Sequence, residues 1–152
     1  MKDIDAFACV VGPGSFTGIR VGMSVIKGFC KVYNKPVVWL NTFEVVSNTV
    51  KKGVVLLNST NTSCFYAKIK GANIVETGVV VKDQVEELSN DETVFVLEEE
   101  QLLSSLEYSN IKVIDDLSKM IVDSIIGRLN SMEYGEFVPY YLQLSQAERN
   151  LK

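Results

Sequence analysis

Short apolar runs alternate with stretches of helical periodicity along the chain. Apolar runs bounded by turn residues predict buried strands, whereas apolar residues at three- and four-residue spacing predict amphipathic helices. Strands are expected over residues 5–11, 37–40, 54–57, 64–70, 74–81, 94–97 and 112–114. Helices are expected over residues 17–33, 42–49, 83–88, 98–106 and 117–129. This alternation predicts an α/β fold, and the hairpin around Gly71 predicts a mixed sheet flanked by helices.

Two of the expected helices carry polar residues suited to capping their first turns. Ser15 or Thr17 can cap the helix that begins there. Asn41 precedes Glu44 by three residues, which is a variant of the capping box. These residues set the helix boundaries independently of the apolar pattern.

A glycine-rich loop, Gly12-Pro13-Gly14-Ser15, separates the first strand from the first helix. Pro13 fixes its own φ and Gly14 can adopt a positive φ, so the pair predicts a sharp turn. The unpaired N–H groups of the first helical turn would then make Gly14, Ser15 and Thr17 candidates for binding an anion. The spacing is neither that of a P-loop nor that of the dinucleotide fingerprint. Ordinary capping of a helix after a strand explains the same residues, and both interpretations stay open.

The helix over residues 17–33 carries small residues at helical spacing. Gly18, Gly22, Val25 and Phe29 form one row, and Ser24 and Gly28 form a second. A glycine in a helix interior costs roughly 1 kcal/mol relative to alanine. Close approach of another helix, from this chain or a second one, would offset that cost. Tight packing of the helix on its own sheet explains the pattern equally well.

Composition narrows the function classes. The chain has 152 residues, 47% of them hydrophobic, which allows one domain with a core or two small lobes. The net charge of −4 makes direct nucleic-acid binding unexpected. No apolar run approaches the length of a membrane span, and acidic residues stand where a signal peptide is basic.

The cysteine and histidine content excludes further classes of function. Three widely spaced cysteines in apolar contexts predict buried, reduced thiols in a cytoplasmic protein. The chain contains no histidine, which excludes a Ser-His-Asp triad, a Cys-His dyad and any histidine-ligated metal site within it. We therefore expect no metal site and no catalytic residues of the histidine-dependent kinds.

The loop and the helix after it, with the sequence GPGSFTGIRVGMSVIKGF, resemble the signature of the bacterial TsaB (YeaZ) family. The preceding DIDAFACVV, the following VVWLNTFEVV and the ending PYYLQLSQAERNLK are similar to the corresponding family segments. The related catalytic protein TsaD has a similar Gly-Pro-Gly loop without Ser-Phe-Thr-Gly. It also has a histidine metal motif, for which this chain has no residues.

The resemblance implies an actin-like ASKHA (ribonuclease H-like) fold. It implies a division into residues 1–52, an incomplete N-terminal lobe, and residues 53–152, a C-terminal α/β lobe. The family's N-terminal strands and helix would be absent ahead of residue 5. The first strand would then expose an apolar edge, and such edges pair with other chains. We therefore expect self-association, as a dimer, through residues 5–33.

The resemblance also implies a non-catalytic scaffold role in making threonylcarbamoyladenosine on tRNA beside the anticodon. The implied partners are TsaD and, through it, the ATPase TsaE. The implied partner surface is the helix over residues 17–33, and the glycine loop would be a relic of a nucleotide-binding ancestor, with no cofactor. The interface residues expected on that helix are Gly18, Gly22, Val25, Ile26 and Phe29.

Two positions depart from the family pattern. Asn58-Ser59-Thr60 stands where family members usually have an Asp-Ala-Arg-like turn. Gln143 stands where an arginine usually follows Tyr-Leu.

Two other functions are weighed against the scaffold role. A nucleotide-binding ATPase or phosphotransferase of the same superfamily would need acids near the phosphates to hold Mg²⁺. Asp3 and Asp5 precede their strand, and Asp115 and Asp116 most simply cap a helix. A peptidase would need a base beside a nucleophile such as Ser15, Thr17 or Cys9. Lys27 is about three helical turns from Ser15, too far for that role.

Overall fold

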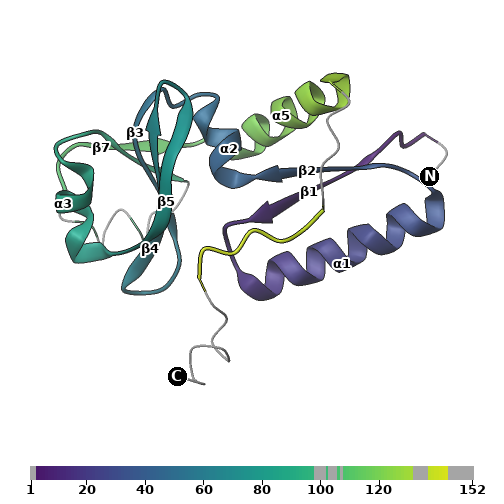
Figure 1. Cartoon of the computed structure of the whole chain (residues 1–152), viewed down its shortest axis with the longest axis horizontal. Coiled ribbons are helices and arrows are strands. Elements are labelled where there is room, and N and C mark those ends of the chain that lie inside the picture. Colours follow the sequence, from purple (N-terminus) through teal and green to yellow (C-terminus); the bar gives the residue numbers. More distant parts are fainter. Residues whose placement is uncertain (1–2, 98–101, 103–105, 107, 132–136, 144–152) are drawn as a thin grey trace.

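The computed structural model describes residues 3–97, 102, 106, 108–131 and 137–143, and these residues form two sheets (Figure 1). The first sheet is a parallel pair, β1 (Phe7–Gly12) and β2 (Val37–Asn41). The second has the strand order β5-β4-β3-β6-β7. Its strands are β3 (Lys52–Asn58), β4 (Ser63–Lys70), β5 (Asn73–Val81), β6 (Val94–Leu97) and β7 (Ile111–Ile114). Pairing is antiparallel among β3, β4 and β5 and parallel among β3, β6 and β7, which confirms the predicted mixed sheet.

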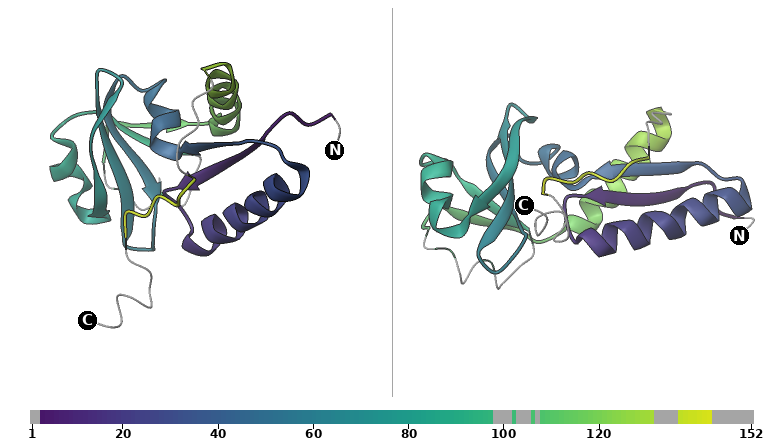
Figure 2. Two further views of the ribbon diagram at one scale, coloured as in Figure 1. Left: turned by 45° about the vertical axis from the view of Figure 1, so that its right-hand side comes forward. Right: turned by 60° about the horizontal axis from the view of Figure 1, so that its bottom comes forward.

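Helices cover both faces of the small sheet. The helical elements of the described chain are α1 (Phe16–Tyr33), α2 (Thr42–Ser47), the 3-10 turn η1 (Lys82–Gln84), α3 (Val85–Ser89) and α5 (Leu117–Ser131), and of these α3 packs on the large sheet. α1 lies on one side of β1 and β2, and α5 lies on the other (Figure 2). The helix expected over residues 98–106 falls almost entirely outside the described residues. No helix in the described part of the chain is both long and apolar enough to cross a membrane.

The core is divided unevenly. Phe43 of α2 is fully buried against one face of the large sheet, and Val85 of α3 is buried against the other. Under α1 only Val11, Ile19 and Met23 form a buried cluster. The small sheet therefore has little core of its own and depends on segments that return to it from later in the chain.

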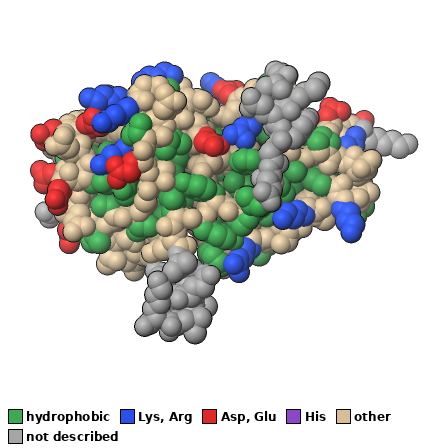
Figure 3. All heavy atoms as spheres, viewed as in Figure 1, with side chains coloured by type: hydrophobic (Ala, Val, Ile, Leu, Met, Phe, Trp, Pro, Cys, Tyr) green, Lys and Arg blue, Asp and Glu red, His purple; other side chains and the backbone are tan. Residues whose placement is uncertain are grey.

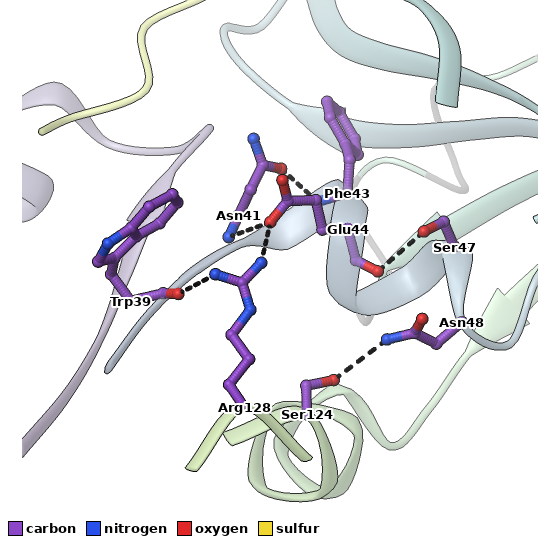
Figure 4. Close-up of polar contacts among 8 residues, drawn as sticks. All are labelled: Trp39, Asn41, Phe43, Glu44, Ser47, Asn48, Ser124 and Arg128. Atoms are coloured by element: carbon purple, nitrogen blue, oxygen red, sulfur yellow. Dashed lines mark hydrogen bonds and ion pairs between the residues drawn. The ribbon is translucent and has the colours of Figure 1, made fainter. Parts of the chain in front are cut away.

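One such segment is α5, which Arg128 ties to the small sheet. The Arg128 guanidinium donates to the Trp39 carbonyl at 2.7 Å and pairs with Glu44 Oε2 at 2.7 Å (Figure 4). Asn48 Nδ2 donates to Ser124 Oγ at 3.5 Å beside this pair. The expected division of the chain at residue 52 stays a prediction. Both α5 and the 137–143 segment contact residues before that position.

The local sequence signals for the helix starts are confirmed. Ser15 Oγ accepts the Gly18 N–H, and Asn41 and Glu44 form the full capping box. Asp116 Oδ1 accepts the Lys119 N–H at the start of α5, as expected of a capping aspartate.

Candidate functional site

The glycine loop turns at a different residue from the one expected. Gly12 has φ +123°, whereas Gly14 does not have a positive φ. A Cβ atom at Gly12 would lie 2.5 Å from the Tyr140 carbonyl oxygen and 3.0 Å from Ile19. Glycine is therefore required at Gly12 because the 137–143 segment approaches it closely. The loop sequence alone does not predict that contact.

The 137–143 segment joins the loop, α1 and the large sheet. The Tyr140 N–H donates to the Val11 carbonyl at 2.9 Å, and its hydroxyl lies 3.1 Å from Thr77 Oγ1 on β5. Tyr141 stacks on Phe16 with ring centroids 4.6 Å apart. The expected extended tail is therefore also the strap that connects the two sheets.

A cleft of about 680 Å³ lies between the glycine loop, the end of β3 and this segment. None of the described residues that line it is charged. Gly14, Ser15 and Thr17, the anion candidates, all line the cleft, together with Asn58. The Asn58 Oδ1 atom is buried and has no hydrogen-bond partner among the described residues. The cleft thus offers a helix N-terminus and polar side chains, but no lining carboxylate for Mg²⁺.

The outward side of α1 is apolar and open to solvent. The exposed fractions are 57% for Val21, 47% for Val25, 39% for Phe29 and 74% for Val32. Val25 and Phe29 were expected in a partner interface, whereas Val21 and Val32 were not, because the row that starts at Gly18 and Gly22 does not include them. Ile26, also expected there, is half-buried, since it follows Ile19 and Met23 at helical spacing.

The glycines of α1 do not serve packing within the described chain. A Cβ atom at Gly22 or at Gly28 would meet nothing within 4 Å. A Cβ atom at Gly18 would approach only the capping side chain of Ser15, at 3.3 Å. The interpretation that the Gly22 and Gly28 positions allow tight packing on the helix's own sheet is therefore wrong.

The cysteines are free and two of them are less buried than expected. Cys64 is buried, whereas Cys9 and Cys30 are half-buried. Burial raises the pKa of the Cys9 and Cys30 thiols above the usual value, so the thiolate is disfavoured at both. Among the described residues no cluster of three or more cysteine, aspartate or glutamate side chains could hold a metal ion.

A comparison with protein families decides the relationship. Residues 1–114 match the family described as TsaD: tRNA N6-adenosine threonylcarbamoyltransferase, which is more than half of the 152-residue chain. The chain belongs to the TsaD family. The TsaD-family match and the solved structures below confirm the expected resemblance to the TsaB/TsaD group.

Two solved structures share the fold of this TsaD-family chain. YeaZ from Pseudomonas aeruginosa superimposes with a TM-score of 0.65 at 14% identity, over 91% of this chain and 76% of YeaZ. A structure described as an uncharacterized protein with similarity to peptidase YEAZ from Pseudomonas aeruginosa gives a TM-score of 0.56 at 16% identity, over 92% of this chain and 74% of that one. The expected ASKHA fold is confirmed, and at these identities the likeness concerns the fold alone.

The two departures from the family pattern meet in the cleft of this TsaD-family chain. Ser59 Oγ donates to Gln143 Oε1 at 3.2 Å, and both residues line the cleft beside Asn58. The sequence positions are 84 residues apart. A neutral hydrogen bond therefore joins the middle of the Asn58-Ser59-Thr60 turn to Gln143, the position where the resemblance implied an arginine.

Proposed function

We propose that this chain is a non-catalytic partner subunit for threonylcarbamoyladenosine synthesis on tRNA, acting in the cytoplasm. It docks on a TsaD subunit through the outward side of α1 and meets TsaE only through TsaD. It needs no cofactor and makes no direct contact with tRNA. Family membership supports the pathway, and the surface of α1 supports the docking role.

The observation that carries this proposal is the combination of exposed valines and open glycine positions on one helix face. On this helix of 18 residues, more than half of the surface of Val21 and of Val32 is exposed, and 47% of that of Val25. Exposed apolar residues that adjoin one another mark interaction sites more often than solvated surface. Glycines at Gly22 and Gly28 leave the backbone accessible, as close helix-to-helix approach requires.

The test is a pull-down of TsaD by this chain and by the Gly22→Leu variant. A Cβ atom at Gly22 would meet nothing within 4 Å in the described chain, so we expect the variant to fold, whereas the leucine side chain should block close approach of a second helix. The matched control is Gly127→Leu on α5, where a Cβ atom also meets nothing within 4 Å. We expect the wild-type chain and Gly127→Leu to retain TsaD and raise its tRNA modification rate, and Gly22→Leu to do neither. Equal retention by all three chains would contradict docking through α1.

Self-association through residues 5–33 is the related proposal for the isolated chain. Among the described residues, the outer edge of β1 is paired only at its end, where the Val11 carbonyl accepts the Tyr140 N–H. Phe7 at the other end packs against Phe29 and Tyr33, with ring centroids 5.6 and 6.3 Å apart. Sedimentation velocity over a concentration series tests it, and a monomer at every concentration would refute it.

A second candidate function, nucleotide binding, is favoured by one observation. The Asn58 Oδ1 atom, which has no hydrogen-bond partner in the described part of the chain, lies at a cleft that also contains the N-terminus of α1. Helix N-termini are positions that favour phosphate binding. Titration calorimetry with ATP, with and without Mg²⁺, tests this candidate. A one-to-one isotherm that Asn58→Ala abolishes would establish nucleotide binding, and no heat at millimolar ATP would remove it.

A further inference from the structure

The basic residues of α1 form a row that Ser24 and Gly28 separate from its exposed valines. Arg20, Lys27 and Lys31 are spaced by seven and four residues, which places them on one side of an α-helix. All three side chains are exposed. Figure 3 shows blue side chains following α1 along the lower right of the molecule, with no red among them.

The positive charge of this row is unusual in a chain that is acidic overall. The helix sequence contains three basic residues and no aspartate or glutamate, whereas the whole chain has a net charge of −4. The local charge of α1 is therefore opposite to that of the molecule. General solvation of a surface helix would not require this, because such helices usually mix both signs.

Two of the three basic groups are held in place by aromatic rings. The Arg20 guanidinium lies 4.0 Å from the centre of the Phe16 ring, and its Nε donates to the Tyr141 hydroxyl at 3.0 Å. The Lys27 ammonium lies 5.3 Å from the centre of the Phe137 ring. Ordered side chains lose less conformational entropy on binding, so this row is suited to recognising fixed charges.

We infer that α1 recognises an amphipathic helix of its partner protein that carries carboxylates along one edge of an apolar stripe. This inference rests on the proposed docking role and adds the chemistry of the partner. The valines of α1 at residues 21, 25 and 32 pack on the apolar stripe. The row of Arg20, Lys27 and Lys31, about 16 Å long at 1.5 Å per residue, pairs with the carboxylates.

A second copy of the chain matches this surface less well. In an antiparallel pair of α1 helices related by a two-fold axis, the two basic rows fall on the same side of the interface. No acidic residue of either helix would offset their repulsion. Docking of an acidic partner weakens as salt is added, whereas self-association of this kind strengthens, so the two occupants respond to salt with opposite signs.

The experiment measures the affinity of the full chain for purified TsaD at about 50 mM and about 500 mM salt. It compares the wild-type chain, the Lys27→Glu/Lys31→Glu variant, and Lys119→Glu on α5 as the charge control. Thermal melts followed by circular dichroism check that each variant is folded. We expect the double variant to lose about tenfold or more in affinity at low salt, and Lys119→Glu to lose none. We also expect wild-type affinity to fall at high salt.

Each other outcome overturns a distinct statement. If TsaD binds equally at both salt concentrations and the folded double variant binds as wild type does, the acidic-partner inference is wrong while the proposed docking stands. If TsaD binds to no version at any salt concentration, the proposed function and this inference both fail. If the isolated chain retains tRNA and the double variant does not, the row binds nucleic acid instead and the inference is overturned.

Discussion

Gly22 offers the sharpest test of why α1 contains glycines. Gly22 lies in the interior of an 18-residue helix, its φ is not positive, and a Cβ atom there would meet nothing within 4 Å. Nothing in the described chain therefore opposes Gly22→Ala, whereas alanine is favoured over glycine in a helix interior by roughly 0.8–1.0 kcal/mol. For a chain of this size that gain corresponds to a melting temperature higher by about 2–4 °C.

The assay is thermal denaturation of the isolated chain together with measurement of TsaD affinity. Gly127→Ala on α5 is the matched control, because it is also a helical glycine whose Cβ atom would meet nothing. We expect both variants to be more stable than wild type, and only Gly22→Ala to bind TsaD more weakly. Destabilisation by Gly22→Ala would show that the glycine serves the chain's own packing. A stabilised Gly22→Ala variant with unchanged affinity would show that the partner does not use this position.

Three further predictions concern the folded chain. Gly12→Ala should lower the free energy of unfolding by about 2 kcal/mol or more, because φ is +123° and the Cβ atom would meet the Tyr140 carbonyl; an unchanged urea midpoint would contradict this. Arg128→Gln should cost about 1–3 kcal/mol in the same urea assay, because two charge-assisted bonds between α5 and the small sheet are lost; a cost near zero would mean that they contribute nothing. The hydrogen bond to Glu76 raises the pKa of Tyr66 from 10.0 to about 12, so its stabilising effect is complete below pH 10 and is lost as the pH rises through about 12. Absorbance titration should show a late tyrosine transition that Glu76→Gln shifts to lower pH, and no difference between the two titrations would refute the assignment.

Much of the secondary structure follows from local physics. The helix starts at Ser15 and Asn41 were predictable because a capping side chain reaches only two or three residues along its own chain. The strands were predictable because a short apolar run between turn residues is typical of a buried strand, whichever strands it pairs with. The spacing of the small residues of α1 predicted a partner surface on that helix, and this stays a prediction.

The tertiary structure decided everything that joins distant positions. Gly12, and not Gly14, is the residue that must be glycine, because Tyr140 approaches it from 128 positions along the chain. Ser59 and Gln143 meet in the cleft for the same reason. The sequence pattern alone left the Gly22 position open to two explanations, and the lack of any described atom within 4 Å of a Cβ there removed one of them. Periodicity records which side of an element is apolar, but the identity of its neighbour depends on how the whole chain is packed.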